Sequence, residues 1–292
     1  QAFAISGVSG HGGVLPKMVN RSVMEKNKNV SVLDFTLPAG CEIENVKKVM
    51  GKLSPATDNA FLQINPTDDP KIIRILAAER NPLEKSYAPD WDEIDESDGI
   101  PFATGVDGAS MVFSPKKTPH CLVSGLSGGG KSVLVQGLVY GALIRGWDLA
   151  VIDPVKGGAD FKFAEDYIRA MAIEKDDFFA AAGLMKMIYA EVARRVRMNS
   201  KHGVASFADL PEAERPNRIL LIIDEFTSAI EQEKVPPRSD DAELEAERDA
   251  IIALNNAKLF IAQFTGKILR EARSAGVTVI LATQKLSAKS LD

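Results

Sequence analysis

In the second half of the chain, short apolar runs alternate with longer stretches in which apolar residues recur at helical spacing. Between short apolar runs, apolar positions at helical spacing predict helices over 131–144, 178–201 and 251–274. The short runs are continuously apolar, as in strands that are buried on both faces of a parallel sheet. They are residues 121–123, 149–152, 219–223 and 277–281. This alternation predicts an α/β fold for residues 118–292.

The first part of the chain has a different pattern. Residues 1–29 show no sustained periodicity, which predicts an N-terminal loop or linker segment with one short element. Strand-like runs on either side of a helical pattern then predict a small α+β domain over 30–117. This domain includes an acidic linker at 81–98 and a hairpin around Asp107-Gly108, a dipeptide typical of type I′ turns.

Composition excludes several classes of protein. Of the 292 residues, 45% are hydrophobic and 26% are charged, which is typical of a folded globular chain rather than a disordered or membrane-embedded one. Cys41 and Cys121 form no metal-binding or disulfide pattern, which favours a reducing, cytoplasmic location. Because the first residue is Gln1 rather than Met, we expect a fragment whose membrane anchor, where it has one, lies outside these residues.

The segment 125–132 reads GLSGGGKS and satisfies G-x-x-x-x-G-K-[ST] between a predicted strand and a predicted helix. Glycines let successive backbone N–H groups point at phosphate oxygens, and the helix N-terminus favours negative charge. Lys131 is expected to reach the β- and γ-phosphates, and the Ser132 hydroxyl to bind Mg²⁺. The predicted nucleotide-binding residues are Gly125, Leu126, Ser127, Gly128, Gly129, Gly130, Lys131 and Ser132.

Polar residues follow three further predicted strands. Asp224 and Glu225 follow the run 219–223, at the strand end where open parallel sheets bind ligands. We predict that Asp224 holds Mg²⁺ and that Glu225, pointing the other way along the strand, orients or deprotonates the attacking water. Gln284 is predicted to sense the γ-phosphate beside the Asp224 strand. For Asp153, indirect contact with the nucleotide and a plain strand end are equally favoured.

These segments, in this order, resemble the motor domain of the FtsK/SpoIIIE double-stranded DNA translocases. The segments are 118–132, Asp153-Pro154, 191–204, 219–226 and 271–284. The resemblance implies a RecA-like P-loop NTPase core with a mainly parallel sheet, preceded by a small α+β domain. It also implies an ATPase that assembles as a hexameric ring and pulls double-stranded DNA through its pore, in chromosome partition, cell division or conjugation.

The resemblance also assigns roles to residues. By motif, 125–132 bind ATP, Asp224 and Glu225 are the metal and catalytic acids, and Gln284 is the sensor. Arg273 stands at a basic position before the last strand and is our candidate for a residue that acts across the subunit interface. The pore loops of RecA-like rings follow the later strands, and the lysines in those segments are candidates for DNA contact: Lys156, Lys162, Lys285 and Lys289.

Two departures from the family pattern keep other functions open. Residues 231–262 form an insertion, and the chain stops soon after Gln284, before the remaining motor segment and any winged-helix DNA reader. One alternative is an ATPase similar to those of type VII secretion, which drive protein export. Another is a nucleotide-binding module that switches rather than pumps. For the DNA motor we expect the cytoplasmic part of a membrane-associated protein.

The net charge of −5 is unevenly distributed. Residues 90–98 contain six acids and no base, and residues 231–249 contain eight acids and three bases. The rest of the chain is therefore mildly basic, which is compatible with a partner that carries phosphates.

Overall fold

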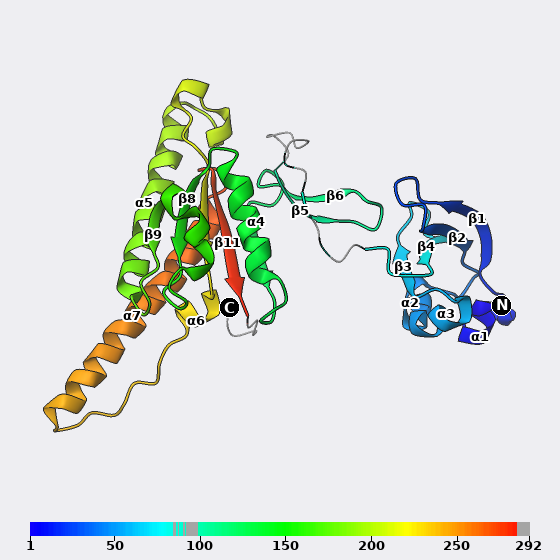
Figure 1. Cartoon of the computed structure of the whole chain (residues 1–292), viewed down its shortest axis with the longest axis horizontal. Helices are drawn as coiled ribbons and strands as arrows, with labels where there is room; N and C mark the ends of the chain where they lie inside the picture. The colour runs from blue at the N-terminus through cyan, green and yellow to red at the C-terminus, as the bar shows by residue number, and fades with distance from the viewer. Residues whose placement is uncertain (84–85, 87, 90, 92–98, 285–292) are drawn as a thin grey trace. The chain divides into compact units, whose positions relative to one another are not determined.

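The structure is a computed structural model that describes residues 1–83, 86, 88, 89, 91 and 99–284. Its contacts divide the chain into two compact units (Figure 1). They consist of Gln1–Asp90 with Ala103–Met111, and of Trp91–Phe102 with Val112–Asp292. The N-terminal segment is part of the first unit, whereas the sequence predicts a boundary at residue 29. Part of the acidic linker expected at 81–98 lies outside the described residues.

The first unit is built on an antiparallel sheet in the order β1-β2-β4-β3. Its strands are β1 (Lys17–Val23), β2 (Ser31–Thr36), β3 (Phe61–Asn65) and β4 (Ile72–Ala78). Its helices are α1 (Ala2–Ser6), α2 (Ile43–Lys48) and α3 (Met50–Thr57), with a 3-10 turn, η1 (His11–Gly13). Phe3, Val46 and Ile73 are buried in its hydrophobic core. The prediction of a small α+β domain before the α/β core is confirmed.

Residues 1–29 are not the loop or linker segment that their sequence predicts. They form α1, η1 and the strand β1, which pairs with β2 from Lys17↔Thr36 to Val23↔Ser31. All seven β1 residues are exposed, and β1 lies at the edge of the sheet. A strand that buries neither face needs no alternation of apolar and polar residues, so it leaves no period-two signal.

The hairpin predicted around Asp107 has a different turn from the predicted one. Strands β5 (Ile100–Thr104) and β6 (Ser110–Phe113) pair as a two-stranded sheet. The Gly108 N–H donates to the Gly105 carbonyl, and Gly108 has a positive φ of 72°. Asp107 does not have a positive φ, which a type I′ turn requires at both central residues. The strands are therefore joined by a longer loop, residues 105–109, that contains a left-handed glycine.

The second unit is built on a five-stranded parallel sheet in the order β7-β11-β10-β8-β9. Its strands are β7 (His120–Ser124), β8 (Asp148–Ile152), β9 (Ile168–Ala172), β10 (Ile219–Ile223) and β11 (Val277–Thr283). The four strands expected from continuous apolar runs are confirmed. β9 was not expected, because exposed residues such as Arg169 interrupt the apolar run of this edge strand.

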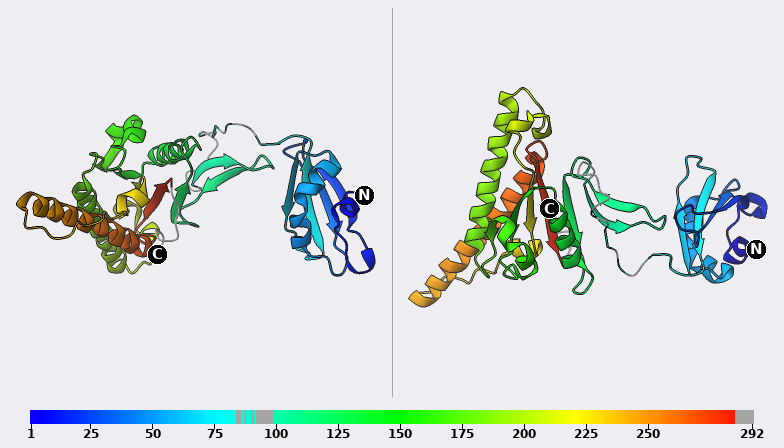
Figure 2. Two further views of the ribbon diagram at one scale, coloured as in Figure 1. Left: turned by 90° about the horizontal axis from the view of Figure 1, so that it is seen from below. Right: turned by 45° about the horizontal axis from the view of Figure 1, so that its top comes forward.

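Helices cover both faces of this sheet (Figures 1 and 2). Helix α4 packs on one face, and α5 and α7 pack on the other. The helices are α4 (Lys131–Leu143), α5 (Phe178–Lys201), α6 (Phe226–Ile230) and α7 (Ala242–Glu271), with 3-10 segments η2 (Ala159–Tyr167), η3 (Phe207–Asp209) and η4 (Glu212–Glu214). This three-layer arrangement is that of a RecA-like P-loop NTPase core, as predicted.

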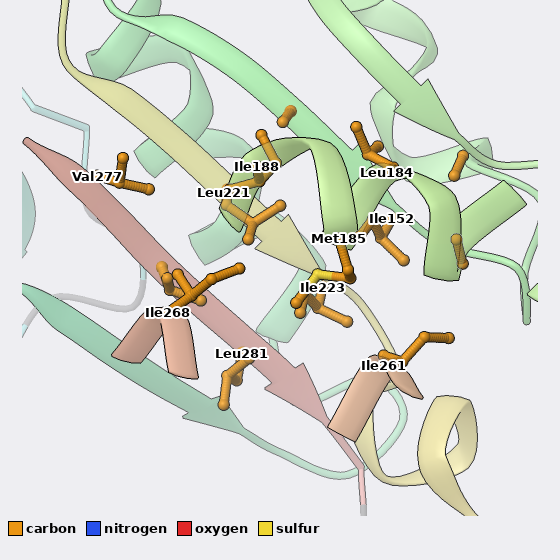
Figure 3. Packing of buried hydrophobic residues seen from close by; sticks show 14 of the residues in the cluster. Ile152, Leu184, Met185, Ile188, Leu221, Ile223, Ile261, Ile268, Val277 and Leu281 are labelled. Atoms are coloured by element: carbon orange, nitrogen blue, oxygen red, sulfur yellow. The ribbon is translucent and has the colours of Figure 1, made fainter. Parts of the chain in front are cut away.

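Strand β10 lies in the middle of the sheet and is buried along its whole length. Leu221 and Ile223 face α5 and α7, whereas Leu220 and Ile222 face α4. Figure 3 shows Ile223 beside Met185 of α5. Since successive side chains of a strand point to opposite faces, burial on both sides explains the uninterrupted apolar run.

Helix α7 begins earlier than the helix expected at 251–274. Asp241 caps its N-terminus by accepting hydrogen bonds from two first-turn N–H groups. The predicted insertion, 231–262, therefore consists of an irregular segment and the N-terminal part of α7, which extends beyond the sheet (Figure 1). Although α7 has 30 residues, no helix in the described part of the chain is apolar and long enough to cross a membrane.

Arg195 of α5 anchors the segments that lead into the two central strands. Its side chain is 2% exposed and donates to the carbonyl oxygens of Asn217 (2.8 Å) and Ala275 (3.2 Å). Asn217 precedes β10, and Ala275 precedes β11. Glu191 accepts a hydrogen bond from Arg195 Nε at 2.7 Å, which balances the buried charge. One side chain thus holds α5 against the amino ends of both strands.

Replacing Arg195 with alanine should destabilise the second unit by about 3 kcal/mol or more, because two buried carbonyl groups lose their donor. Trp91 and Trp147, the two tryptophans of the chain, both belong to this unit, so their fluorescence during urea unfolding measures the loss. Arg194→Ala is the matched control. Arg194 also contacts Glu191 but is 51% exposed, so its loss should stay below about 1 kcal/mol. Equal losses in the two variants would contradict the anchoring role.

Candidate active site

The parallel sheet brings four loops to one edge. Strands β7, β11, β10 and β8 are adjacent and parallel, so their carboxyl ends lie side by side. Thr283 is paired with Ser124, and Ile223 is paired with both Leu281 and Ile152. The glycine-rich loop, the predicted acids, the predicted sensor and the loop after β8 therefore meet at this edge.

The loop 125–132 joins β7 to α4. Gly128 and Gly130 are left-handed, with φ of 78° and 85°, a conformation that other residues rarely adopt. The Gly125 N–H donates to the Thr283 carbonyl at 3.3 Å, which ties the loop to β11. Gly130 is the N-cap of α4 and offers no side-chain oxygen, so the first-turn N–H groups of the helix are available to an anion.

Lys131 lies at the centre of the site. The residue is 7% exposed, and its Nζ lies 2.7 Å from Asp224 Oδ1 and 2.8 Å from Glu225 Oε1. Both carboxylates are also buried, so these charges interact where water and salt screen them weakly. The structure thus brings the predicted phosphate-binding lysine together with the two predicted acids.

The sequence predicts that the Glu225 side chain points away from that of Asp224. In the structure it does not. β10 ends at Ile223, so Glu225 is not part of the strand. It has φ 47° and ψ 42° and is the N-cap of α6. This left-handed conformation is uncommon for a residue with a side chain. It turns the chain so that both carboxylates contact Lys131.

One oxygen of Glu225 accepts hydrogen bonds from three side chains. Its Oε1 lies 2.8 Å from Lys131 Nζ, 2.7 Å from Lys156 Nζ and 2.9 Å from Gln284 Nε2. Burial raises the pKa of Glu225, but its contacts with the two lysines outweigh burial and hold the pKa below its ordinary value. The carboxylate is therefore ionised, and Gln284 lies beside it at the end of β11.

The sequence predicts that Lys156 contacts DNA. In the structure it instead contacts the acids Asp224 and Glu225. Its Nζ lies 3.1 Å from Asp224 Oδ2 and 3.8 Å from Asp160 Oδ2, besides its contact with Glu225. The loop after β8 leaves the same sheet edge as the acids, which explains the difference from the prediction. Burial lowers the pKa of Lys156, and hydrogen bonds to Glu225 and Asp224 raise it by more, so the amine is protonated.

Ser132 also contacts the segment after β8. Its Oγ donates to Asp160 Oδ2 at 2.7 Å, and Gln136 of α4 donates to the Asp160 carbonyl at 2.8 Å. Asp160 belongs to η2. η2 is therefore hydrogen-bonded to the first two turns of α4.

Asp153 shapes the loop that carries Lys156. It is completely buried, and its carboxylate accepts hydrogen bonds from the N–H groups of Lys156 (2.9 Å) and Gly158 (2.8 Å). Burial raises its pKa, against the effect of these two hydrogen bonds. Because each oxygen holds the loop, the structure favours a structural role for Asp153 over contact with a nucleotide.

The site contains groups that suit a magnesium ion. Ser132 Oγ and the Asp224 carboxylate offer oxygen ligands, the kind that Mg²⁺ prefers. Asp224 Oδ2 already accepts a cation, since Lys156 Nζ lies 3.1 Å away. These two residues are therefore chemically suited to hold the metal that the glycine-rich loop implies.

The remaining predicted residues lie elsewhere or outside the described residues. Arg273 is exposed and precedes β11, at the opposite edge of the sheet from Gln284. The seven residues of β11 separate these edges by about 20 Å. Lys162 is exposed on η2, whereas Lys285 and Lys289 lie outside the described residues.

Sequence reasoning missed Asp160 and assigned Lys156 to DNA. A signal for both was present, because the segment 153–160 follows a predicted central strand and must start at the nucleotide edge of the sheet. The order of residues alone does not show that this loop turns back over the acids. That requires the hydrogen bonds that Asp153 makes to the loop backbone.

Comparison with known proteins decides the family. A profile of the FtsK/SpoIIIE family matches residues 90–288. The chain belongs to the FtsK/SpoIIIE family. The matched segment contains every residue of the site described above.

Individual relatives agree with this assignment. The DNA translocase FtsK of Pseudomonas aeruginosa is 25% identical over 240 residues, which are 76% of this chain and 27% of that protein. The DNA translocase FtsK of Caldanaerobacter subterraneus subsp. tengcongensis is 26% identical over 189 residues, which are 62% of this chain and 23% of that protein. The chain thus spans about a quarter of the length of these relatives.

One solved structure is similar in fold. The structure of the pCW3 conjugation coupling protein TcpA, in a monomer form with ATPγS, matches with a TM-score of 0.62 at 20% identity. The match covers 100% of this chain and 77% of that chain. At this identity, the likeness supports the fold.

The lowered pKa of Glu225 predicts how the stability of the nucleotide-free protein depends on pH. A carboxylate whose pKa is lowered by folding stabilises the fold above its unfolded pKa, near 4.5, and loses this contribution as the pH falls through the folded pKa. The difference in free energy of unfolding between wild type and Glu225→Gln should therefore be constant above about pH 5.5 and shrink below about pH 4.5.

Urea unfolding followed by tryptophan fluorescence measures this difference. Glu212→Gln, which changes an exposed carboxylate on η4, is the control and should show no comparable dependence on pH. A constant difference for Glu225→Gln over the whole acid range would show that the two lysines do not stabilise the charged form.

Proposed function

We propose that this chain is the ATP-hydrolysing unit of a motor that moves double-stranded DNA. The proposal rests on the convergence of Lys131, Asp224, Glu225 and Gln284 beside a glycine-rich loop. Membership of the FtsK/SpoIIIE family and similarity to FtsK translocases support DNA as the cargo. The second unit is the motor, and the first unit is a separate domain.

The glycine-rich loop and Lys131 bind the phosphates of ATP. The N–H groups of 125–132 and of the first turn of α4 donate to phosphate oxygens, since no side chain caps this helix. Lys131 exchanges its carboxylate partners for the β- and γ-phosphates. Glu225 then loses one of three donors on Oε1, so that this oxygen becomes able to orient the attacking water. Gln284 senses the γ-phosphate through its hydrogen bond to Glu225.

Ser132 and Asp224 are the proposed holders of Mg²⁺. When bound, the metal neutralises negative charge on the β- and γ-phosphate oxygens. The residues themselves supply oxygen ligands, and Asp224 is fixed by the Glu225 N–H at 2.9 Å. Ser132 gives up or shares its hydrogen bond to Asp160 in this state.

Arg273 supports assembly as a ring. It lies at the edge of the sheet opposite the nucleotide site, so it cannot reach the nucleotide of its own copy. In a head-to-tail assembly, the sheet edge that carries Arg273 in one copy faces the nucleotide edge of the next copy. Copies related in this way by a rotation close into a ring. We assign Arg273 to the neighbouring copy's ATP and the ring to six copies, as in the family.

The DNA contacts and the cellular setting follow from the same proposal. Lys162, Lys285 and Lys289 remain proposed DNA contacts, and Lys156 no longer belongs to that group, since it contacts the acids. We place the motor in the cytoplasm, where duplex DNA and ATP meet, with any membrane anchor outside these residues. Chromosome partition, cell division and conjugation are all processes that such a motor serves.

The proposal predicts ATP hydrolysis that duplex DNA stimulates. Wild-type protein should hydrolyse ATP faster with duplex DNA than without it. Both rates are measured at the same salt concentration, because binding to a polyanion depends on salt. Lys131→Ala should lower turnover about 100-fold or more, because it removes the charge at the phosphates. Glu225→Gln should bind ATP and stall, since it retains a hydrogen-bonding side chain but no base.

Other outcomes identify other functions. Stimulation by secreted peptides in place of duplex DNA would identify a protein exporter of the type VII kind. Nucleotide binding without turnover in the wild type would identify a switch. Full turnover in Glu225→Gln would remove Glu225 from its assigned role.

A further inference from the structure

The loop between β8 and η2 delivers a second ammonium group to the active site. Lys156 Nζ and Lys131 Nζ contact the same atom, Glu225 Oε1, at 2.7 Å and 2.8 Å. They also contact different oxygens of Asp224, at 3.1 Å for Lys156 and 2.7 Å for Lys131. Two cations from separate loops therefore converge on one pair of carboxylates.

The backbone of Lys156 is fixed in place by a buried carboxylate. Asp153 accepts hydrogen bonds from the N–H groups of Lys156 and Gly158. Gly158 is left-handed, with φ 69°, and a Cβ there would lie 2.8 Å from Ile173, so a side chain does not fit. A loop held at both ends in this way positions its lysine before any ligand arrives, which is the arrangement that stabilises charge most effectively.

The side chain of Lys156 is not that of an ordinary surface lysine. It is 29% exposed, and its three ion-pair partners come from two segments: Asp160 lies in η2, and Asp224 and Glu225 follow β10. An isolated surface pair would contribute little. A protonated amine next to two buried acids instead balances their charge.

We propose that Lys156 is a second cation for the terminal phosphate of ATP, supplied by the same copy of the chain. This inference rests on the proposed ATPase function. Lys156 shares Oε1 of Glu225 with Lys131 and Gln284, the residues assigned to the γ-phosphate, so all three donors point at one place. A phosphate oxygen that enters there replaces the carboxylate as acceptor for the lysine. Charge on the transferred phosphoryl group is what catalysis must stabilise.

The proposal distinguishes ATP from ADP. Only ATP carries the phosphate that Lys156 contacts, so removal of the amine should weaken binding of ATP and leave binding of ADP nearly unchanged. Lys131 contacts the β-phosphate as well, and its removal should weaken binding of both nucleotides. The two lysines are thus separable by binding measurements, without reference to turnover.

Binding of ADP and of a non-hydrolysable ATP analogue should be measured by calorimetry on wild type, Lys156→Ala and Lys156→Arg. For Lys156→Ala, affinity for the analogue should fall about tenfold or more, as for loss of one charge-assisted contact, and affinity for ADP should change less than about twofold. ATP turnover should fall on the order of 100-fold, and Lys156→Arg should recover part of both losses. Lys186→Ala, at an exposed lysine of α5, is the matched control and should behave as wild type.

The outcomes separate this inference from the proposed function. If wild type binds neither nucleotide, the ATPase proposal itself is wrong. If wild type binds and hydrolyses ATP but Lys156→Ala keeps its preference for the ATP analogue, Lys156 has no phosphate contact. Faster turnover in Lys156→Ala would likewise overturn the inference, since it would make the lysine an inhibitor. Lys156→Gln, which keeps a polar chain of similar length, gives the same test where Lys156→Ala fails to fold.

Discussion

The active site depends on the burial of β10 on both faces. Leu220 and Ile222 pack toward α4, while Leu221 and Ile223 pack toward α5 and α7, so the strand cannot slip by one residue without reversing both faces. Its register with β8 and β11 places the four loops of the site at one edge. Arg195 holds the other ends of the central strands. The positions of the charged groups thus follow from apolar packing.

Charge balance explains why these groups contact one another. A buried charge without a partner costs several kcal/mol, whereas two lysines and two acids in contact neutralise each other. Lys131, Lys156, Asp224 and Glu225 form such a set. Phosphates can replace the acids as partners of the lysines, and a metal can replace the lysines as partner of Asp224. In such an exchange Glu225 keeps the hydrogen bond from the neutral Gln284 side chain, but its carboxylate loses both lysines.

Sequence patterns predicted the parts of this structure that depend on burial and on motif chemistry. Continuous apolar runs indicated β7, β8, β10 and β11, and the glycine-rich motif indicated the start of α4 at Lys131. Patterns failed for the strand β1, because its residues are all exposed and apolar and polar residues therefore do not alternate along it. They also failed where one backbone angle sets the direction of a side chain. The left-handed φ of Glu225 reverses the direction expected for its carboxylate. The position of Lys156 depends on a loop whose shape is fixed by Asp153, a contact that no spacing rule describes.

The left-handed turn at Glu225 also joins this residue to β11. Glu225 is the N-cap of α6, and Thr227 of that helix is hydrogen-bonded to Thr283 of β11 at 2.7 Å. Thr283 precedes Gln284, which donates to Glu225, and its carbonyl accepts from Gly125 of the glycine-rich loop. Glu225, Gln284 and the glycine-rich loop are therefore linked in a closed set of hydrogen bonds. A ligand that moves one member must strain or break a bond to another, so the members of this set move together.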